Sequence, residues 1–253
     1  MHIVFRVDAS SIIGYGHVMR CLTLANALAN KGMDVSFITR EHQGHINQLI
    51  TEKKYPLILL AEGESDVILQ NSDTWLGCTP AHDAQQCIEA IQKIAPIDYL
   101  IVDHYAVNAQ WHSLLAPYCK RLIVIDDLAS RPLLCDFLLD QTLNRSAEQY
   151  QTLVPEHCTM LLGKDYMLLR DEFSHYRAQA KVQREMRCLQ LGHDNKNVHI
   201  LISMGGGDLD NLSKIALLAI NTLIVNIPKI SATLVISSQS QYLASLKELC
   251  DNF

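Results

Sequence analysis

The sequence carries little positive charge. Its 21 lysines and arginines are outnumbered by 27 aspartates and glutamates, which gives a formal net charge of -6, and no cluster of Lys and Arg is expected to form a stripe. Nucleic acids and anionic membrane surfaces are bound mainly through clustered basic side chains. We therefore expect neither a nucleic-acid partner nor a membrane partner, although a few local arginines could hold one small anionic ligand.

Long apolar runs are also missing. No stretch approaches the roughly 20 apolar residues that cross a membrane, and Met1 leads directly into an apolar strand without the two regions of a signal peptide. The eight cysteines are widely spread and form no C-x-x-C pair, which favours reduced structural thiols over a catalytic cysteine. The expected location is the cytoplasm.

The motifs of two common nucleotide sites are absent. The sequence has no G-x-x-x-x-G-K-[ST] loop, and a dinucleotide fingerprint would need a glycine where Met19 stands and an acidic end to the second strand, where Arg40 and Glu41 stand. His42 and His45 could share a helical face, but two exposed histidines are weak evidence for a metal. We therefore predict no cofactor and no metal.

Enough apolar sequence is present for a sizeable core. Of the 253 residues, 49% are hydrophobic and 19% are charged, which disfavours disorder. Apolar runs alternate with helical periodicity, as in an α/β fold with a doubly wound parallel sheet. Strands are expected over 3–7, 34–39, 57–60, 99–102, 122–125, 137–139 and 158–162, and helices over 18–29, 43–53, 81–94 and 109–118.

A charged segment divides the chain into two predicted domains. Residues 173–189 are rich in charge and glutamine, and 181–187 have the composition of an exposed helix or linker. We predict an N-terminal Rossmann-like domain over 1–180, a linker over 181–196 and a second Rossmann-like domain over 197–253. The second domain has only about two βα units, with strands over 198–203 and 232–236, so we expect it to be incomplete.

The segment 5–20 is the strongest functional motif, because an apolar strand leads through a glycine turn into a helix. Gly14 and Gly16 allow a tight turn and close approach of a ligand, and Arg20 follows one helical turn after His17. The helix dipole disfavours an imidazolium at His17 by about 0.3–1 kcal/mol, and a neutral imidazole can act as a general base. A buried or capping histidine is the alternative. The position at a strand's carboxyl end, where open α/β sheets bind ligands, favours the base.

Polar side chains also follow several of the other predicted strands. In a doubly wound sheet these ends lie along one edge and could converge on one crevice, although each aspartate could instead cap the next helix. These residues are Asp8, Asp103, Tyr105, Asp126, Asp127, Asp140 and Asn144. A second glycine turn, at 204–208, repeats the design of strand, turn and helix.

Taken together, the motifs resemble one family, the UDP-2,4-diacetamido-2,4,6-trideoxy-L-altropyranose hydrolases of pseudaminic acid biosynthesis. The similar blocks occur in order at 6–10, 14–20, 102–105, 125–129, 138–141, 163–173 and 202–208. The resemblance implies a GT-B-like fold, with the nucleotide bound mainly by the second domain. The late part of that domain is expected beyond residue 253.

The resemblance also implies a reaction. His17 is expected to activate a water molecule that attacks the anomeric carbon of the UDP-linked sugar with inversion, and UDP leaves. A GT-B glycosyltransferase that uses a UDP-sugar donor, or a truncated and silent sugar-binding domain, are the alternatives. A monomer is expected, with oligomerisation left open. Substrate contacts are expected from Arg6, Asp8, Gly14, Tyr15, Gly16, Arg20, Tyr105, Asp127, Asn144, Arg170, Met204, Gly205, Gly206, Gly207 and Asp208.

Overall fold

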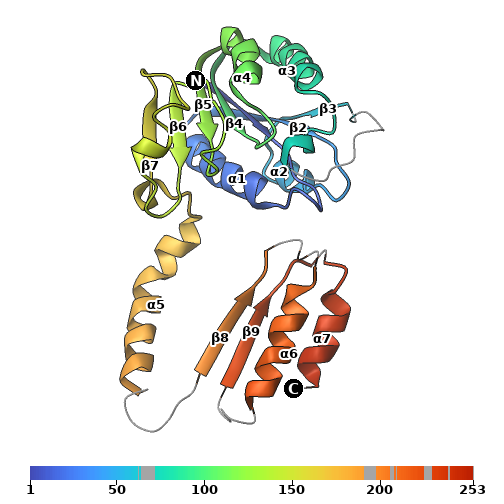
Figure 1. The fold of residues 1–253 in the computed structure, drawn as a ribbon, viewed down its shortest axis with the longest axis vertical. Coiled ribbons are helices and arrows are strands. Elements are labelled where there is room, and N and C mark those ends of the chain that lie inside the picture. The colour runs from blue at the N-terminus through green and yellow to red at the C-terminus, as the bar shows by residue number, and fades with distance from the viewer. Residues whose placement is uncertain are drawn as a thin grey trace. The chain divides into compact units, whose positions relative to one another are not determined.

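The computed structural model describes residues 1–61, 63, 72–190, 198–205, 208, 210–224, 230–238 and 240–252 (Figure 1). The chain divides into two compact units, Met1–Leu169 and Arg170–Phe253. Among the helices of this described part, none is both long and apolar enough to span a membrane.

The first unit is built on a parallel sheet of seven strands in the order β3-β2-β1-β4-β5-β6-β7, which confirms the predicted doubly wound α/β fold. The strands are β1 (His2–Val7), β2 (Asp34–Arg40), β3 (Leu57–Leu60), β4 (Ile97–Asp103), β5 (Cys119–Ile125), β6 (Phe137–Asp140) and β7 (Thr159–Leu162). The helices are α1 (Gly16–Ala29), α2 (Gln48–Glu52), α3 (Pro80–Ile94) and α4 (Ala109–Leu115), with 3-10 turns η1 (Ser72–Thr74), η2 (Ala116–Tyr118), η3 (Ala147–Gln149) and η4 (Lys164–Tyr166).

Helix α2 is shorter than the predicted helix over 43–53, and that prediction is wrong at its start. Gly44 has φ +75°, in the left-handed region that a right-handed helix cannot contain. A Cβ on Gly44 would also lie 2.0 Å from Oγ of Ser11, so this glycine turn packs closely against the loop after β1. The helix can begin only after that turn, at Gln48.

The direction of the chain across the sheet reverses between β1 and β4, which are neighbours although they are far apart in sequence. From β1 the chain moves outward through β2 to β3, and then it returns through α3 to β4 on the other side of β1. Ligands of open α/β sheets bind outside the carboxyl ends of the strands at such a switch point. The topology therefore places a crevice beside Asp103, which ends β4, and the glycine loop, which follows β1.

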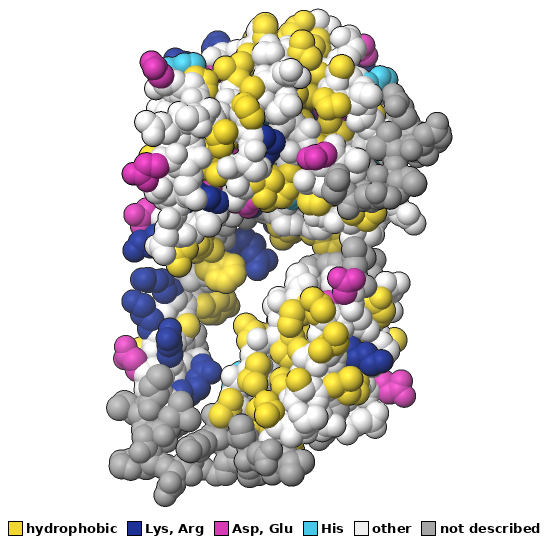
Figure 2. All heavy atoms as spheres, viewed as in Figure 1, with side chains coloured by type: hydrophobic (Ala, Val, Ile, Leu, Met, Phe, Trp, Pro, Cys, Tyr) yellow, Lys and Arg dark blue, Asp and Glu magenta, His cyan; other side chains and the backbone are white. Residues whose placement is uncertain are grey.

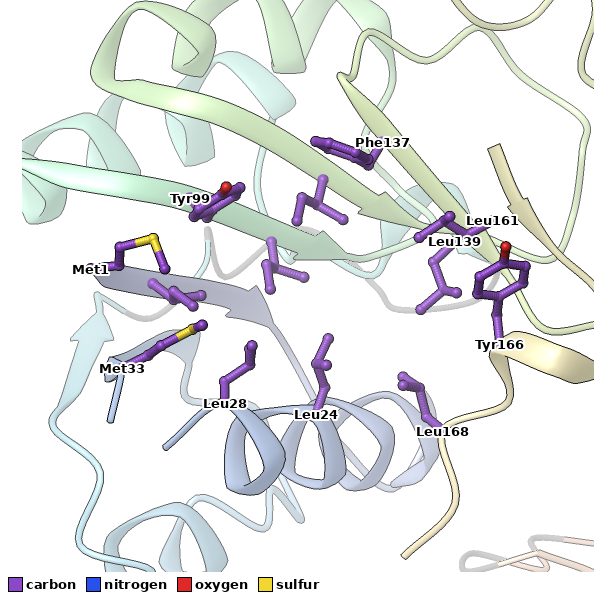
Figure 3. Close-up of a pocket in the computed structure, with 13 residues that line it drawn as sticks. Met1, Leu24, Leu28, Met33, Tyr99, Phe137, Leu139, Leu161, Tyr166 and Leu168 are labelled. Carbon is purple, nitrogen blue, oxygen red and sulfur yellow. The ribbon is translucent and has the colours of Figure 1, made fainter. Parts of the chain in front are cut away.

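One face of the sheet is covered by α3 and α4, around buried Trp111, Ile91 and Leu115. The other face packs against α1, and its uncovered part forms an apolar cavity of about 410 Å³ (Figure 3). The cavity exists because residues 126–136 and 141–158 form no α-helix over β5, β6 and β7. The described residues that line it include no Asp, Glu, His, Lys or Arg side chain.

The second unit contains α5 (Asp171–Gln190), β8 (Val198–Ser203), α6 (Leu212–Ile224), β9 (Ile230–Val235) and α7 (Leu243–Asp251). Strands β8 and β9 pair in parallel, and a small core forms around Ile202, Leu217, Ile220 and Leu246. The division between the compact units falls before α5, earlier than the predicted linker. Residues 181–190 of that linker continue α5, and 191–196 lie outside the described residues.

Basic side chains gather along α5, as Figure 2 shows. Arg177, Lys181 and Arg184 are exposed and are spaced four and three residues apart, which places them on one side of a helix. The expectation that no basic stripe forms is therefore wrong for this helix. The three basic residues are separated by other residues in the sequence and come to one side only when the helix forms.

Buried His112 is expected to make the fold sensitive to acid. It lies on α4 with 0% exposure, and its Nδ1 accepts a hydrogen bond from Leu134 N–H at 3.3 Å. Burial, reinforced by the charge of Arg131, lowers its pKa to about 3, whereas the pKa of an unfolded histidine is about 6.5. Between these values the unfolded chain binds the extra proton, so the stability that His112 contributes falls as pH falls.

We expect this group to remove about 2 kcal/mol of stability between pH 7 and pH 5. Urea unfolding at both pH values measures the difference. His112→Gln should reduce the difference in stability between pH 7 and pH 5, whatever the substitution does to stability at pH 7. His157→Gln is the matched control because His157 is exposed. An unchanged pH difference in His112→Gln contradicts the assignment.

Candidate active site

The loop after β1 is held in shape by its own hydrogen bonds. Oγ of Ser10 accepts from the N–H groups of Ile12 at 3.1 Å and Ile13 at 2.9 Å, and the N–H of Gly14 donates to the carbonyl of Ser10 at 2.9 Å. Gly14 has φ +83°, which a side chain rarely tolerates. The loop thereby fixes the start of α1 at Gly16, one residue before His17.

His17 is paired with the carboxylate that ends β4. Its Nδ1 lies 2.6 Å from Oδ1 of Asp103. Burial would raise the pKa of Asp103, but His17 and Arg20 together hold it well below the usual range, so the carboxylate is ionised and can only accept. We therefore assign the proton to Nδ1. The lone pair is then on Nε2, which makes no hydrogen bond within the described part of the chain and can take a proton from a ligand.

Arg20 connects the two carboxylates of the site. Its Nε donates to Oδ2 of Asp103 at 2.6 Å, its Nη2 donates to Oδ1 of the same group at 2.6 Å, and its Nη1 donates to Asp127 at 3.0 Å. Burial opposes the charge on Arg20, but these carboxylates raise its pKa above the usual value. One guanidinium thus faces two carboxylates, which leaves one negative charge in excess.

Two aromatic rings form a wall beside the histidine. The Tyr105 ring meets His17 edge to face, with centroids 4.6 Å apart, and the Trp75 ring stacks on Tyr105 at 5.6 Å. The Tyr105 hydroxyl donates to Oδ1 of Asp127. Burial and Asp127 raise the pKa of Tyr105 above its usual value, so its hydroxyl stays neutral. Nε1 of Trp75 is buried without a hydrogen-bond partner among the described residues.

Arg6 and Asp8 lie too deep to contact a substrate, which corrects their predicted role. Both side chains are 0% exposed and form an ion pair at 2.6 Å. Arg6 also pairs with buried Asp83 at 2.6 Å, and Oδ1 of Asp8 accepts from the backbone N–H of Arg40 at 2.7 Å. Residues two apart along an extended chain share a face. Arg6 and Asp8 therefore point to the same side, where they form buried ion pairs at the carboxyl end of β1.

The remaining predicted residues of the first unit lie at the rim. Tyr15 is the N-cap residue of α1 and makes no side-chain cap, and Gly16 is exposed. Asn144 is exposed in a turn with φ +61°. Its neighbour Arg145 instead reaches inward, because its Nη2 donates to the carbonyl of Asp127 at 2.5 Å.

The predicted residues of the second unit have other partners. Asp208 caps α6, because its Oδ1 accepts from Leu212 N–H at 2.8 Å and its Oδ2 from Ser213 N–H at 3.1 Å. The guanidinium of Arg170 lies over the Phe173 ring at 5.5 Å. Met204 is exposed, and Gly205 has φ +80°. Gly206 and Gly207 lie outside the described residues, so their contacts stay predictions.

The structure therefore brings His17, Arg20, Tyr105 and Asp127 together around Asp103. Sequence places Asp103 among the strand-end aspartates, but it does not show which of these aspartates faces the histidine. Trp75 was missed because it lies in a polar, turn-rich stretch that gave no signal. Within the described residues, no group of three His, Cys, Asp or Glu side chains is arranged to hold a metal ion.

No family model matches the chain. It is 32% identical over 213 residues to the UDP-2,4-diacetamido-2,4,6-trideoxy-beta-L-altropyranose hydrolase of Campylobacter jejuni, covering 84% of this chain and 63% of that protein. It is 26% identical over 215 residues to an uncharacterized protein of Methanocaldococcus jannaschii, covering 84% of this chain and 38% of that one.

The fold also has a counterpart among solved structures. The crystal structure of MurG from Acinetobacter baumannii matches 98% of this chain and 63% of its own, with a TM-score of 0.52 and 12% identity. The chain has a GT-B-like fold. This GT-B-like chain spans less than two thirds of the length of each of these relatives. Identity of 12% shows the architecture alone, so the chemistry rests on the site.

Proposed function

We propose that the chain acts on a UDP-linked sugar as a hydrolase, releasing UDP from UDP-2,4-diacetamido-2,4,6-trideoxy-beta-L-altropyranose in pseudaminic acid biosynthesis. The observation that carries the proposal is the pairing of His17 with Asp103, which leaves Nε2 of a histidine at the switch point free to act as a base. The similarity to a hydrolase of this name supports the substrate class. A cytoplasmic location and a monomeric state are part of the proposal.

In the proposed reaction, Nε2 of His17 accepts a proton from water as the oxygen attacks the anomeric carbon. The bond from that carbon to the diphosphate breaks, and UDP leaves with the electron pair. Attack from the face opposite the leaving group inverts the anomeric centre. Asp103 holds the ring in orientation through Nδ1 and stabilises the imidazolium without taking the proton. A diphosphate is a good leaving group, so the scheme needs no general acid.

Arg20 is better suited to positioning than to binding the diphosphate. Its guanidinium already donates to Asp103 and Asp127, so moving it to a phosphate would remove two hydrogen bonds from buried Asp103. We propose that Arg20 keeps Asp103 ionised and holds both carboxylates in place. Tyr105 and Asp127 then lie beside the sugar.

The assay that tests the proposal follows the UDP-sugar by NMR with the chain alone and with added sugar or lipid-linked acceptors. We expect free UDP and the inverted anomer of the free sugar as the first products without any acceptor. Retention of configuration contradicts direct attack by water. Release of UDP only when an acceptor is present replaces the hydrolase with a glycosyltransferase, and no release overturns the proposal for this chain.

Asp103→Asn is expected to lower kcat about 10²-fold, because the amide no longer fixes the ring and a misplaced base costs about this factor. Its NH2 group can donate to Nδ1 and favour the wrong tautomer. Asp98→Asn is the matched control, since it makes the same change at the opposite end of β4, where Asp98 pairs with Lys120. Steady-state kinetics of both variants decides the point. Equal kcat values would remove Asp103 from the mechanism.

A further inference from the structure

Two cysteines from separate segments of the first unit lie in contact. Cys135 comes shortly before β6 and Cys158 directly before β7, and these strands pair with Phe137 opposite Thr159. The Sγ atoms are 3.6 Å apart, and both thiols are free. Sequence alone does not indicate this pair, because 22 residues separate the two cysteines.

The two thiols have different surroundings. Cys135 is 2% exposed and packs in a cluster with Leu133, Leu138 and Tyr150. Cys158 is 9% exposed and lines a surface cavity of about 450 Å³, large enough to admit a small oxidant. An oxidant entering from solvent therefore meets Cys158 first, with Cys135 directly behind it.

The hydrogen bond between the two thiols also favours reaction at Cys158 over Cys135. The hydrogen bond from Cys135 lowers the pKa of Cys158, whereas the contact with Cys158, together with burial, raises the pKa of Cys135. The thiolate is the reactive form of cysteine. By contrast, burial raises the pKa of Cys21 and of Cys87 well above the usual value, which protects those thiols.

We propose that Cys135 and Cys158 form a reversible thiol-oxidation site, in which Cys158 reacts with a peroxide and Cys135 resolves the product to a disulfide. The Cys158 thiolate attacks one oxygen of hydrogen peroxide, the O–O bond breaks, and a sulfenic acid and water result after proton uptake. The Cys135 sulfur then attacks the Cys158 sulfur, its proton leaves with the hydroxyl as a second water, and the S–S bond forms. Two thiols and one peroxide yield one disulfide and two waters.

The test oxidises the folded chain with hydrogen peroxide and maps its peptides by mass spectrometry without reduction. We expect a cross-link between Cys135 and Cys158 with the loss of two hydrogens, reversed by dithiothreitol. Oxidation of Cys158 should be at least about tenfold faster than that of Cys119, whose pKa burial raises to about 11. Cys119→Ser should leave the cross-link unchanged.

Two variants separate the roles of the two thiols. Cys135→Ser should leave Cys158 as a sulfenic acid that dimedone labels, and Cys158→Ser should leave Cys135 reduced. A cross-link to another cysteine overturns the proposal, as does oxidation of exposed Cys250 while Cys135 and Cys158 both stay reduced. The wild-type peptide map decides the matter by itself if either variant folds poorly. The readout does not depend on sugar hydrolysis, so it stands apart from the proposed function.

Discussion

Replacing His17 with asparagine is expected to lower kcat for UDP-sugar hydrolysis about 10²–10⁴-fold, the range that a positioned general base contributes. The proton of the attacking water then has no acceptor at Nε2. Asparagine keeps a polar group near Asp103, whose carboxylate otherwise faces Nδ1 at 2.6 Å. We therefore expect the Kd for the UDP-sugar to change much less than kcat.

Steady-state release of UDP and calorimetric binding of the UDP-sugar measure the two quantities separately. His82→Asn is the matched control, because it makes the same change at an exposed position on α3. Equal unfolding temperatures for the variant and the wild type exclude a loss of fold. A His17→Asn protein that binds the UDP-sugar and hydrolyses it at the wild-type rate refutes the assignment of His17 as the base.

The sheet could be predicted from sequence because each strand carries its own local signal. The buried strands of the first unit are short apolar runs, and every predicted strand there overlaps an observed one. The boundaries of a helix are harder to predict where a turn interrupts its apolar periodicity, as the turn at Gly44 does before α2. Alternation of strands and helices indicates a parallel sheet, whereas the order of the strands and the position of the switch point come from the structure.

The site could be predicted only in part, because its decisive contacts join distant segments. His17 and Gly14 belong to one local motif, but the partner of His17 is 86 residues away and Trp75 gave no signal. Arg6 and Asp8 are buried away from the crevice, although they belong to the same local motif. Sequence shows that a polar residue follows a strand, whereas only the packed structure shows which side of the sheet it faces.

Beneath the site, a buried ionic network holds the carboxyl end of β1. Asp83 of α3 is 0% exposed, and its Oδ2 pairs with Arg6 at 2.6 Å and Arg40 at 2.9 Å. Its Oδ1 accepts from Nε1 of Trp111 at 3.0 Å. Burial would raise the pKa of Asp83, but Arg6 and Arg40 lower it below the usual value. This carboxylate neutralises the guanidinium groups of Arg6 and Arg40, which are shielded from solvent.

Asp83→Asn is therefore expected to destabilise the first unit by about 3–5 kcal/mol, the usual cost of breaking a buried ion pair by removing one partner. The unfolding temperature should fall by roughly 6–20 °C. Glu89→Gln is the matched control, since it changes an exposed acid to its amide on the same helix, and it should cost well under about 1 kcal/mol. Urea and thermal unfolding measure both variants.

The pH dependence of stability provides an independent check. A carboxyl group whose folded pKa lies below its unfolded value contributes its stability above the unfolded pKa of about 3.9 and loses it as pH falls through the folded value. The wild type should therefore lose more stability than Asp83→Asn when the pH is lowered from 5 to 3. Asp8 titrates in both proteins, because Arg6 lowers its pKa well below the usual value although burial alone would raise it. A variant that is as stable as the wild type at pH 7 would mean that Asp8 alone balances the two arginines.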